Sequence, residues 1–141
     1  MKKITLLFSV LFLSATHSFA QIKITKIKNE NKDHYIANVI GYPITGQYNF
    51  INQIEPLTIL NEDGTGIIQN EDLTKENIIW GIECSESGIP IFKEGFNSAS
   101  YAFWYKKNDE KVENWTLQSF TIHYDKKKIY IAGERVKEYI E

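Results

Sequence analysis

The chain has 141 residues, of which 43% are hydrophobic and 13% aromatic, with 16 lysines and arginines against 18 aspartates and glutamates. These values are typical of one globular domain. They exclude a collagen-like repeat, a charge-rich disordered chain and, with a single cysteine, a disulfide scaffold.

Residues 1–20 have the three parts of a secretory signal peptide. Lys2 and Lys3 form a basic start, residues 6–13 are apolar apart from Ser9, and residues 18–20 form a small-x-small cleavage site. We therefore expect cleavage after Ala20 and export to the periplasm or the extracellular space. The apolar run is shorter than the roughly 18 residues that a membrane span needs, so no integral membrane span is expected.

The remaining residues 21–141 are expected to form a single domain. Two of the lysines belong to the signal peptide, which leaves 14 basic and 18 acidic residues and a net charge of 14 − 18 = −4. Because phosphate backbones attract basic surfaces, this charge argues against nucleic acid as a partner. Cys84 has no second cysteine to pair with, so we expect a buried, unreactive thiol.

Short β-branched and aromatic runs separated by turn residues predict an antiparallel all-β fold. The expected strands are 22–27, 34–40, 46–51, 57–61, 66–69, 77–84, 89–93, 99–106, 115–124 and 128–132.

The connections between these strands indicate how the strands pair. Residues 61–66 read Asn-Glu-Asp-Gly-Thr-Gly, in which Gly64 and Gly66 are expected to supply the positive φ values of a tight hairpin. Residues 85–88 are expected to join their flanking strands in the same manner. Since short links force neighbouring strands to pair, the predicted topology is an up-and-down meander.

Alternation along the strands predicts which faces are buried. Ile78, Trp80, Ile82 and Cys84 share one face of their strand and are expected to point inward. The strand at 99–105 carries bulky residues on both faces, so we expect it to be covered on both sides. A meander this apolar closes into a β-barrel of about eight strands or, as the alternative, folds into a β-sandwich.

The last segment, residues 133–141, follows a glycine break, and its apolar residues have helical spacing. A short C-terminal helix and a continued strand are both compatible with this pattern.

Several segments together resemble a known family. These are Gly41-Tyr42, the run from Leu57 to Gly66, the Ile79–Ile82 segment and the aromatic strand 101–105. They are similar to segments of small bacterial secreted proteins with a lipocalin-like domain, over about residues 40–133. The resemblance implies an up-and-down barrel with a pocket open at one end, and binding rather than catalysis.

Catalytic and metal-binding patterns have weaker support than structural explanations. Residues 61–72 can be aligned with a twelve-residue calcium loop, but a strand rather than a helix is expected before them, which favours a hairpin turn. His34 and His123 occur without a nucleophile elbow or a metal-ligand spacing. We therefore expect no enzyme activity, no cofactor and no metal.

Two functions remain open. The first is binding of a small apolar ligand inside the barrel by Trp80, Ile82, Tyr101 and Phe103, although these aromatic residues would equally well fill a core. The second is an envelope protein-binding module, such as an inhibitor or an immunity protein. That function predicts an exposed patch of aromatic and acidic residues near the loop 106–114.

Overall fold

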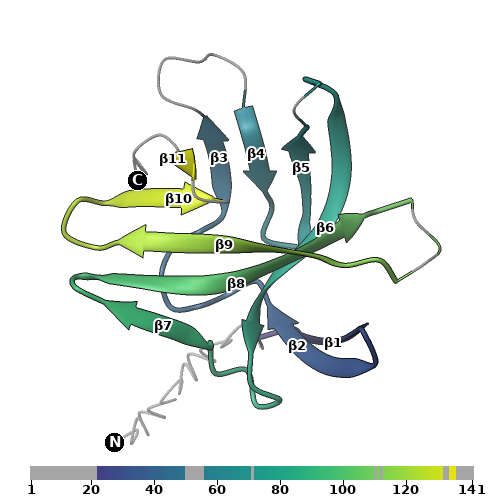
Figure 1. The fold of residues 1–141 in the computed structure, drawn as a ribbon, viewed down its shortest axis with the longest axis horizontal. Coiled ribbons are helices and arrows are strands. Elements are labelled where there is room, and N and C mark those ends of the chain that lie inside the picture. The colour runs from purple at the N-terminus through teal and green to yellow at the C-terminus, as the bar shows by residue number, and fades with distance from the viewer. Residues whose placement is uncertain are drawn as a thin grey trace, which may run out of the picture.

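The computed structural model describes residues 22–49, 56–70, 72–109, 111, 113–131 and 134–135 (Figure 1). The expected signal peptide at 1–20 lies outside these residues. So does most of the expected C-terminal helix, of which only residues 134–135 are described, as a short strand.

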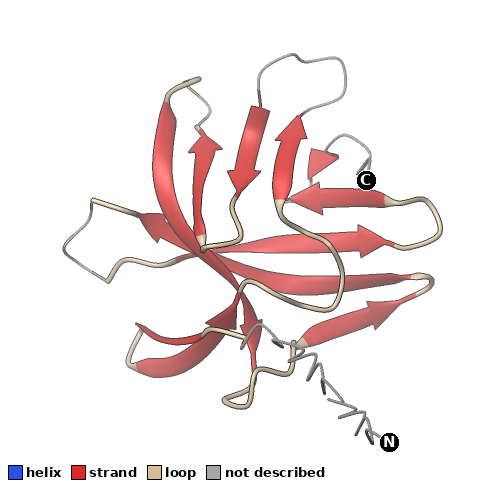
Figure 2. Ribbon diagram, turned by 180° about the vertical axis from the view of Figure 1, so that it is seen from behind, coloured by secondary structure: helices blue, strands red, loops and turns tan. Residues whose placement is uncertain are grey.

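The described residues contain eleven strands, and their positions confirm the expected strands to within a few residues (Figure 2). The strands are β1 (Ile24–Asn29), β2 (Lys32–Ala37), β3 (Gly46–Asn49), β4 (Pro56–Leu60), β5 (Thr65–Gln69), β6 (Lys75–Cys84), β7 (Phe92–Gly95), β8 (Ser98–Lys107), β9 (Thr116–His123), β10 (Lys128–Ile131) and β11 (Glu134–Arg135).

All strand pairings are antiparallel, and eight strands form a continuous path in the order β11-β10-β9-β8-β6-β5-β4-β3. The β1–β2 hairpin joins this path through β6, and β7 joins it through β8. Figures 1 and 2 show β3–β5 crossing the direction of β8–β10, with the long, bent β6 between the two groups. The sheet therefore curls into a half-barrel, which confirms the antiparallel, barrel-like all-β fold.

Two pairings expected of an up-and-down meander do not occur among the described strands: β2 pairs with β6 rather than with β3, and β6 does not pair with the strand that follows it. Residues 85–88 do reverse the chain, but β6 and the following strand share only an isolated bridge between Cys84 and Pro90. Both strands pair instead with β8, which is ten residues long. One half of this long edge pairs with β6 and the other half with β7. Only a two-residue turn joins β7 to β8, so little conformational entropy is lost when these two strands pair.

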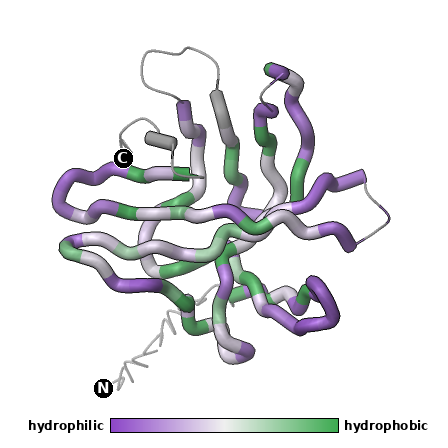
Figure 3. Tube along the Cα trace, in the orientation of Figure 1, coloured by the Kyte–Doolittle hydropathy of each residue, from purple (hydrophilic) through white to green (hydrophobic). Residues whose placement is uncertain are grey.

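The main core lies on the concave face of the half-barrel. Ile78, Trp80, Ile82 and Cys84 of β6 are all buried, as their alternation predicts. Side chains from β3, β4, β8, β9 and β10 join Ile78, Trp80 and Ile82 in one cluster. Figure 3 shows the matching pattern, with hydrophilic residues gathered at the β1–β2 and β9–β10 turns.

A second, smaller core covers the other face of β8. Trp104 packs there with Ile27 and Ile36 of the β1–β2 hairpin and with Trp115. The expectation that the strand at 99–105 is covered on both sides is therefore confirmed. The β1–β2 hairpin can approach β6 this closely because residue 81 is glycine. A Cβ at that residue would lie 2.7 Å from the Cβ of Ile36.

The turn at residues 61–66 confirms the expected hairpin between β4 and β5, with one correction. Gly64 has a φ of +84°, as a tight turn requires. Gly66 does not have a positive φ, because it lies within β5. Its lack of a side chain matters for another reason, since a Cβ there would lie 2.4 Å from the main-chain oxygen of Ile59.

Two aspartates stabilise the turns on either side of β5. Asp63 accepts hydrogen bonds from the hydroxyl and the main-chain N–H of Thr65, at 2.6 and 2.9 Å. Asp72 likewise accepts hydrogen bonds from the hydroxyl and the main-chain N–H of Thr74, at 2.6 and 3.0 Å. These bonds, those from the threonine hydroxyls above all, lower the pKa of both carboxyls below the ordinary value of 3.8.

Acid is therefore expected to weaken both turns. A carboxyl whose pKa is depressed in the folded state stabilises that state above pH 3.8, and the contribution is lost as the pH falls through the folded pKa. We expect the thermal unfolding midpoint of the wild type to fall more steeply below about pH 4 than that of an Asp63→Asn, Asp72→Asn double variant. Parallel pH profiles for the two proteins would contradict this assignment.

Candidate functional site

The four residues expected to bind a ligand lie together in the main core. Trp80, Ile82, Tyr101 and Phe103 have 1%, 0%, 6% and 0% of their surface accessible. The Trp80 and Phe103 rings lie 6.1 Å apart, and a further ring, that of Phe120, lies 6.1 Å from Phe103. Ile82 and Phe103 are fully buried and pack among the other side chains of the main core.

Four of the nine large hydrophobic residues that are exposed in the described part of the chain lie in one short segment, from Ile89 to Phe96. Its large hydrophobic side chains are exposed without exception: Ile89 by 66%, Ile91 by 52%, Phe92 by 51% and Phe96 by 94%. We call these four residues the β7 patch. None of the four residues of β7 itself is buried.

Local chemistry places the β7 patch at the margin of the sheet. The turn before it is closed by a hydrogen bond from the N–H of Ser85 to the carbonyl of Ile89, 2.8 Å long, and Gly88 has the positive φ of +87° that the reversal needs. After β7, a two-residue turn begins at Phe96. Gly95 fits opposite Ser98 because a Cβ at residue 95 would lie 2.5 Å from the Ser98 Oγ.

A row of aromatic rings runs from the β7 patch toward the start of the domain. Phe92 contacts Tyr101, with ring centroids 5.3 Å apart. The hydroxyls of Tyr101 and Tyr124 lie 3.0 Å apart, and the Tyr124 ring meets Tyr42 edge-on at 5.4 Å. Burial, assisted by the hydrogen bond to Tyr124, raises the pKa of Tyr101, so its hydroxyl stays protonated.

A groove of about 410 Å³ lies at the Tyr42 end of this row. Its apolar lining comes from Ile22, Val39, Tyr42, Pro43 and Ile44. This volume falls within the range of about 300–1,000 Å³ that small-molecule sites occupy.

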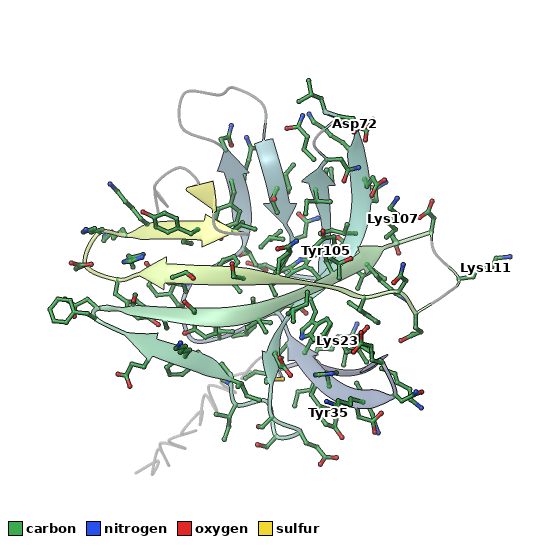
Figure 4. All side chains as sticks on the ribbon, in the orientation of Figure 1. Lys23, Tyr35, Asp72, Tyr105, Lys107 and Lys111 are labelled. Carbon is green, nitrogen blue, oxygen red and sulfur yellow. The ribbon has the colours of Figure 1, made fainter. Side chains whose placement is uncertain are left out.

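A polar groove of about 490 Å³ lies between the β5–β6 turn and the β8–β9 loop. Figure 4 shows Asp72, Tyr105 and Lys107 on this side of the molecule. Much of the lining is already engaged within the protein: Lys107 pairs with Glu76 at 2.6 Å, and Asp72 accepts hydrogen bonds from Thr74. Burial raises the pKa of Tyr105, which removes it as an acid or base near neutral pH.

His34 belongs to a half-buried polar cluster beside the second core. Its Nδ1 lies 2.8 Å from Glu83 Oε1, and Trp104 donates its indole N–H to the other oxygen of that carboxylate at 3.3 Å. The His34 and Trp104 rings also contact each other, at 4.9 Å. These contacts join the β1–β2 hairpin to β6 and β8.

The described residues of the 61–72 segment do not form a calcium loop. The segment contains β5, with Asp63 in the turn before that strand and Asp72 in the turn after it. No group of three or more His, Cys, Asp or Glu side chains suited to a metal ion occurs among the described residues. Cys84 is buried as expected, and burial raises the pKa of its thiol.

Comparison with protein-family models, curated proteins and solved structures finds no match to this chain. Within the described part of the chain, no helix is long and apolar enough to cross a membrane.

We expected an exposed patch of aromatic and acidic residues near the loop 106–114, and the exposed phenylalanines of the described residues lie instead in the β7 patch. The aromatic residues that flank this loop are Tyr105, which is partly buried, and Trp115, which is buried with the Lys106 ammonium 5.4 Å from its ring. The sequence does contain one signal for the β7 patch. Pro90 interrupts the expected strand 89–93, and a proline within a strand is typical of a sheet edge.

Proposed function

We propose that this protein is an exported, non-enzymatic module that binds another protein of the cell envelope through the β7 patch. The observation that carries the proposal is the exposure of every large hydrophobic side chain between Ile89 and Phe96. Soluble domains seldom expose so many large apolar side chains in one short segment unless a partner covers them.

The composition of the β7 patch suits a protein interface. Phe92 and Phe96 offer large, stiff rings, which are common anchors at the centre of interfaces. Lys93 and Glu94 lie between them and supply charged groups for the polar rim. The Phe92 ring also packs against the Tyr101 ring, so this part of the surface is already ordered before a partner binds.

The test is co-purification from the native cell envelope with a Phe96→Ser variant. Wild-type protein is expected to retain a stoichiometric protein partner, and Phe96→Ser is expected to retain at least about tenfold less, the loss typical of an aromatic anchor. A Leu73→Ser variant is the matched control, because it removes another exposed hydrophobic side chain, 72% accessible, from a different turn. Equal retention by all three proteins, or no partner at all, would contradict the proposal.

The apolar groove beside Tyr42 supports a second candidate function, the binding of a small apolar molecule. Its volume of about 410 Å³ and its lining by Ile22, Val39 and Ile44 favour such a ligand at this place. Organic extraction of the protein purified from the envelope would distinguish the two functions. A stoichiometric small molecule, absent from a Val39→Lys variant, would support this second candidate.

A further inference from the structure

We propose that β7 binds its protein partner by strand addition, in which an extended segment of the partner pairs with the outer edge of β7. The proposal rests on the proposed function and specifies how the partner is bound. Strand addition needs an accessible sheet edge whose main-chain groups are not already paired. Within the described residues, β7 pairs only with β8.

The hydrogen bonds of β8 fix the direction of its main-chain groups. The carbonyl of Asn97, just before the strand, accepts from the N–H of Tyr124, on the β9 side. The N–H of Asn108, just after the strand, donates to the carbonyl of Asn77, on the β6 side. Main-chain groups alternate in direction along an antiparallel strand. The main-chain N–H and C=O groups of the even-numbered residues of β8 therefore point toward β6 and β7.

This alternation identifies the outward residues of β7. The partners of Ser98 and Ser100 in the register are Gly95 and Lys93, so these two β7 residues bond to β8. Phe92 and Glu94 alternate with them, and their N–H and C=O groups consequently point away from β8. The outer edge of β7 thus offers two donors and two acceptors.

The charges of β7 disfavour a second copy of this chain as the added strand. A self-pairing that joins Phe92 to Glu94 of the copy places Lys93 opposite Lys93, and like charges directly opposite each other are destabilising. A register centred on Glu94 opposes two carboxylates. A register centred on Phe92 uses Pro90, which has no N–H to donate.

A different segment with complementary charges fits the same edge. Phe92 and Glu94 lie on the face of the sheet that carries Tyr101, and Lys93 lies on the opposite face. The segment we infer has an apolar side chain opposite Phe92 and a basic one opposite Glu94, with an acidic residue between them opposite Lys93. Such a segment extends the sheet and places an apolar side chain against Phe92 of the β7 patch.

A phage-displayed library of random peptides, selected on the mature protein, provides the test. Enriched peptides are expected to show the apolar–acidic–basic alternation. Their affinity is expected to fall by at least about tenfold for Glu94→Pro, because proline removes the outward donor and its ring blocks the edge. Glu94→Ala is the matched control: it keeps the main-chain donor and loses only the carboxylate, so its affinity is expected to fall by less than about fivefold, the contribution of one exposed ion pair.

Amide hydrogen exchange of the wild type gives a second measurement that does not depend on the proline variant folding. In the free protein, Lys93 and Gly95 are expected to exchange slowly and Phe92 and Glu94 rapidly. With an enriched peptide bound, the exchange of Phe92 and Glu94 is expected to slow by about tenfold or more. Unchanged exchange at these two residues, or a selection that enriches no peptide, overturns strand addition. A partner that is lost with Phe96→Ser but retained with Glu94→Pro overturns strand addition alone and leaves the proposed function intact.

Discussion

Replacing Phe103 with alanine is expected to lower the free energy of unfolding by about 3–5 kcal/mol. Phe103 is fully buried, and its ring lies within 6.1 Å of the rings of Trp80 and Phe120 and 5.5 Å from that of Tyr105. Without the ring, the protein loses the free energy gained by transferring the ring from water to the core. It also contains a cavity, because the neighbouring side chains on several strands cannot move far enough to fill the space. Urea denaturation followed by circular dichroism measures the change.

A Leu117→Ala variant is the matched control. Leu117 lies on the neighbouring strand β9, but half of its surface is exposed, so its truncation is expected to change stability by no more than about 0.5 kcal/mol. A loss below about 1.5 kcal/mol for Phe103→Ala would indicate a loosely packed interior. That outcome would favour the ligand site first expected at Trp80, Ile82, Tyr101 and Phe103.

Replacing Gly66 with alanine is expected to destabilise the fold by about 3 kcal/mol, at the upper end of what overpacking costs. The new Cβ would lie 2.4 Å from the carbonyl oxygen of Ile59, and it would also press on Ile78 and Trp80, each 3.3 Å away. Because the nearest atom belongs to the main chain of the paired strand, the β4–β5 pairing must open to accommodate the methyl group.

Gly41→Ala separates this steric effect from backbone strain. Gly41 has a φ of +76°, but no atom lies within 4 Å of a Cβ built there. The substitution is therefore expected to cost only the roughly 1 kcal/mol of a left-handed alanine. Thermal or urea unfolding of the two variants provides the comparison. Equal losses would show that conformation, rather than the contact with Ile59, makes glycine necessary at residue 66.

Much of the fold follows from local patterns. Alternation in β6 identified its buried face, and the Asp63-Gly64 pair identified the hairpin, because both signals are contained within a few neighbouring residues. The role of Gly66 was misassigned, since its need for glycine arises from Ile59 on another strand. Pairing of β6 with β8 was missed for a similar reason: it depends on the length of β8 rather than on the turn at 85–88.

The candidate site was harder to predict than the fold. An aromatic strand such as 101–105 looks the same in sequence whether it lines a pocket or fills a core, because burial depends on what other strands place against it. The β7 patch was hidden in an ordinary apolar run, and only its position at the sheet margin makes it accessible. Exposure of this kind is a property of the tertiary structure, which periodicity over eight residues does not encode.

The division of the core has a spectroscopic consequence. Trp80 lies in the main core, whereas Trp104 and Trp115 lie in the second core, beneath a hairpin joined to the rest of the sheet by three register pairs between β2 and β6. A segment with so few pairings is a natural first unit to open. Intrinsic fluorescence would then shift in two stages on denaturation, first from the tryptophan pair under the hairpin and later from Trp80.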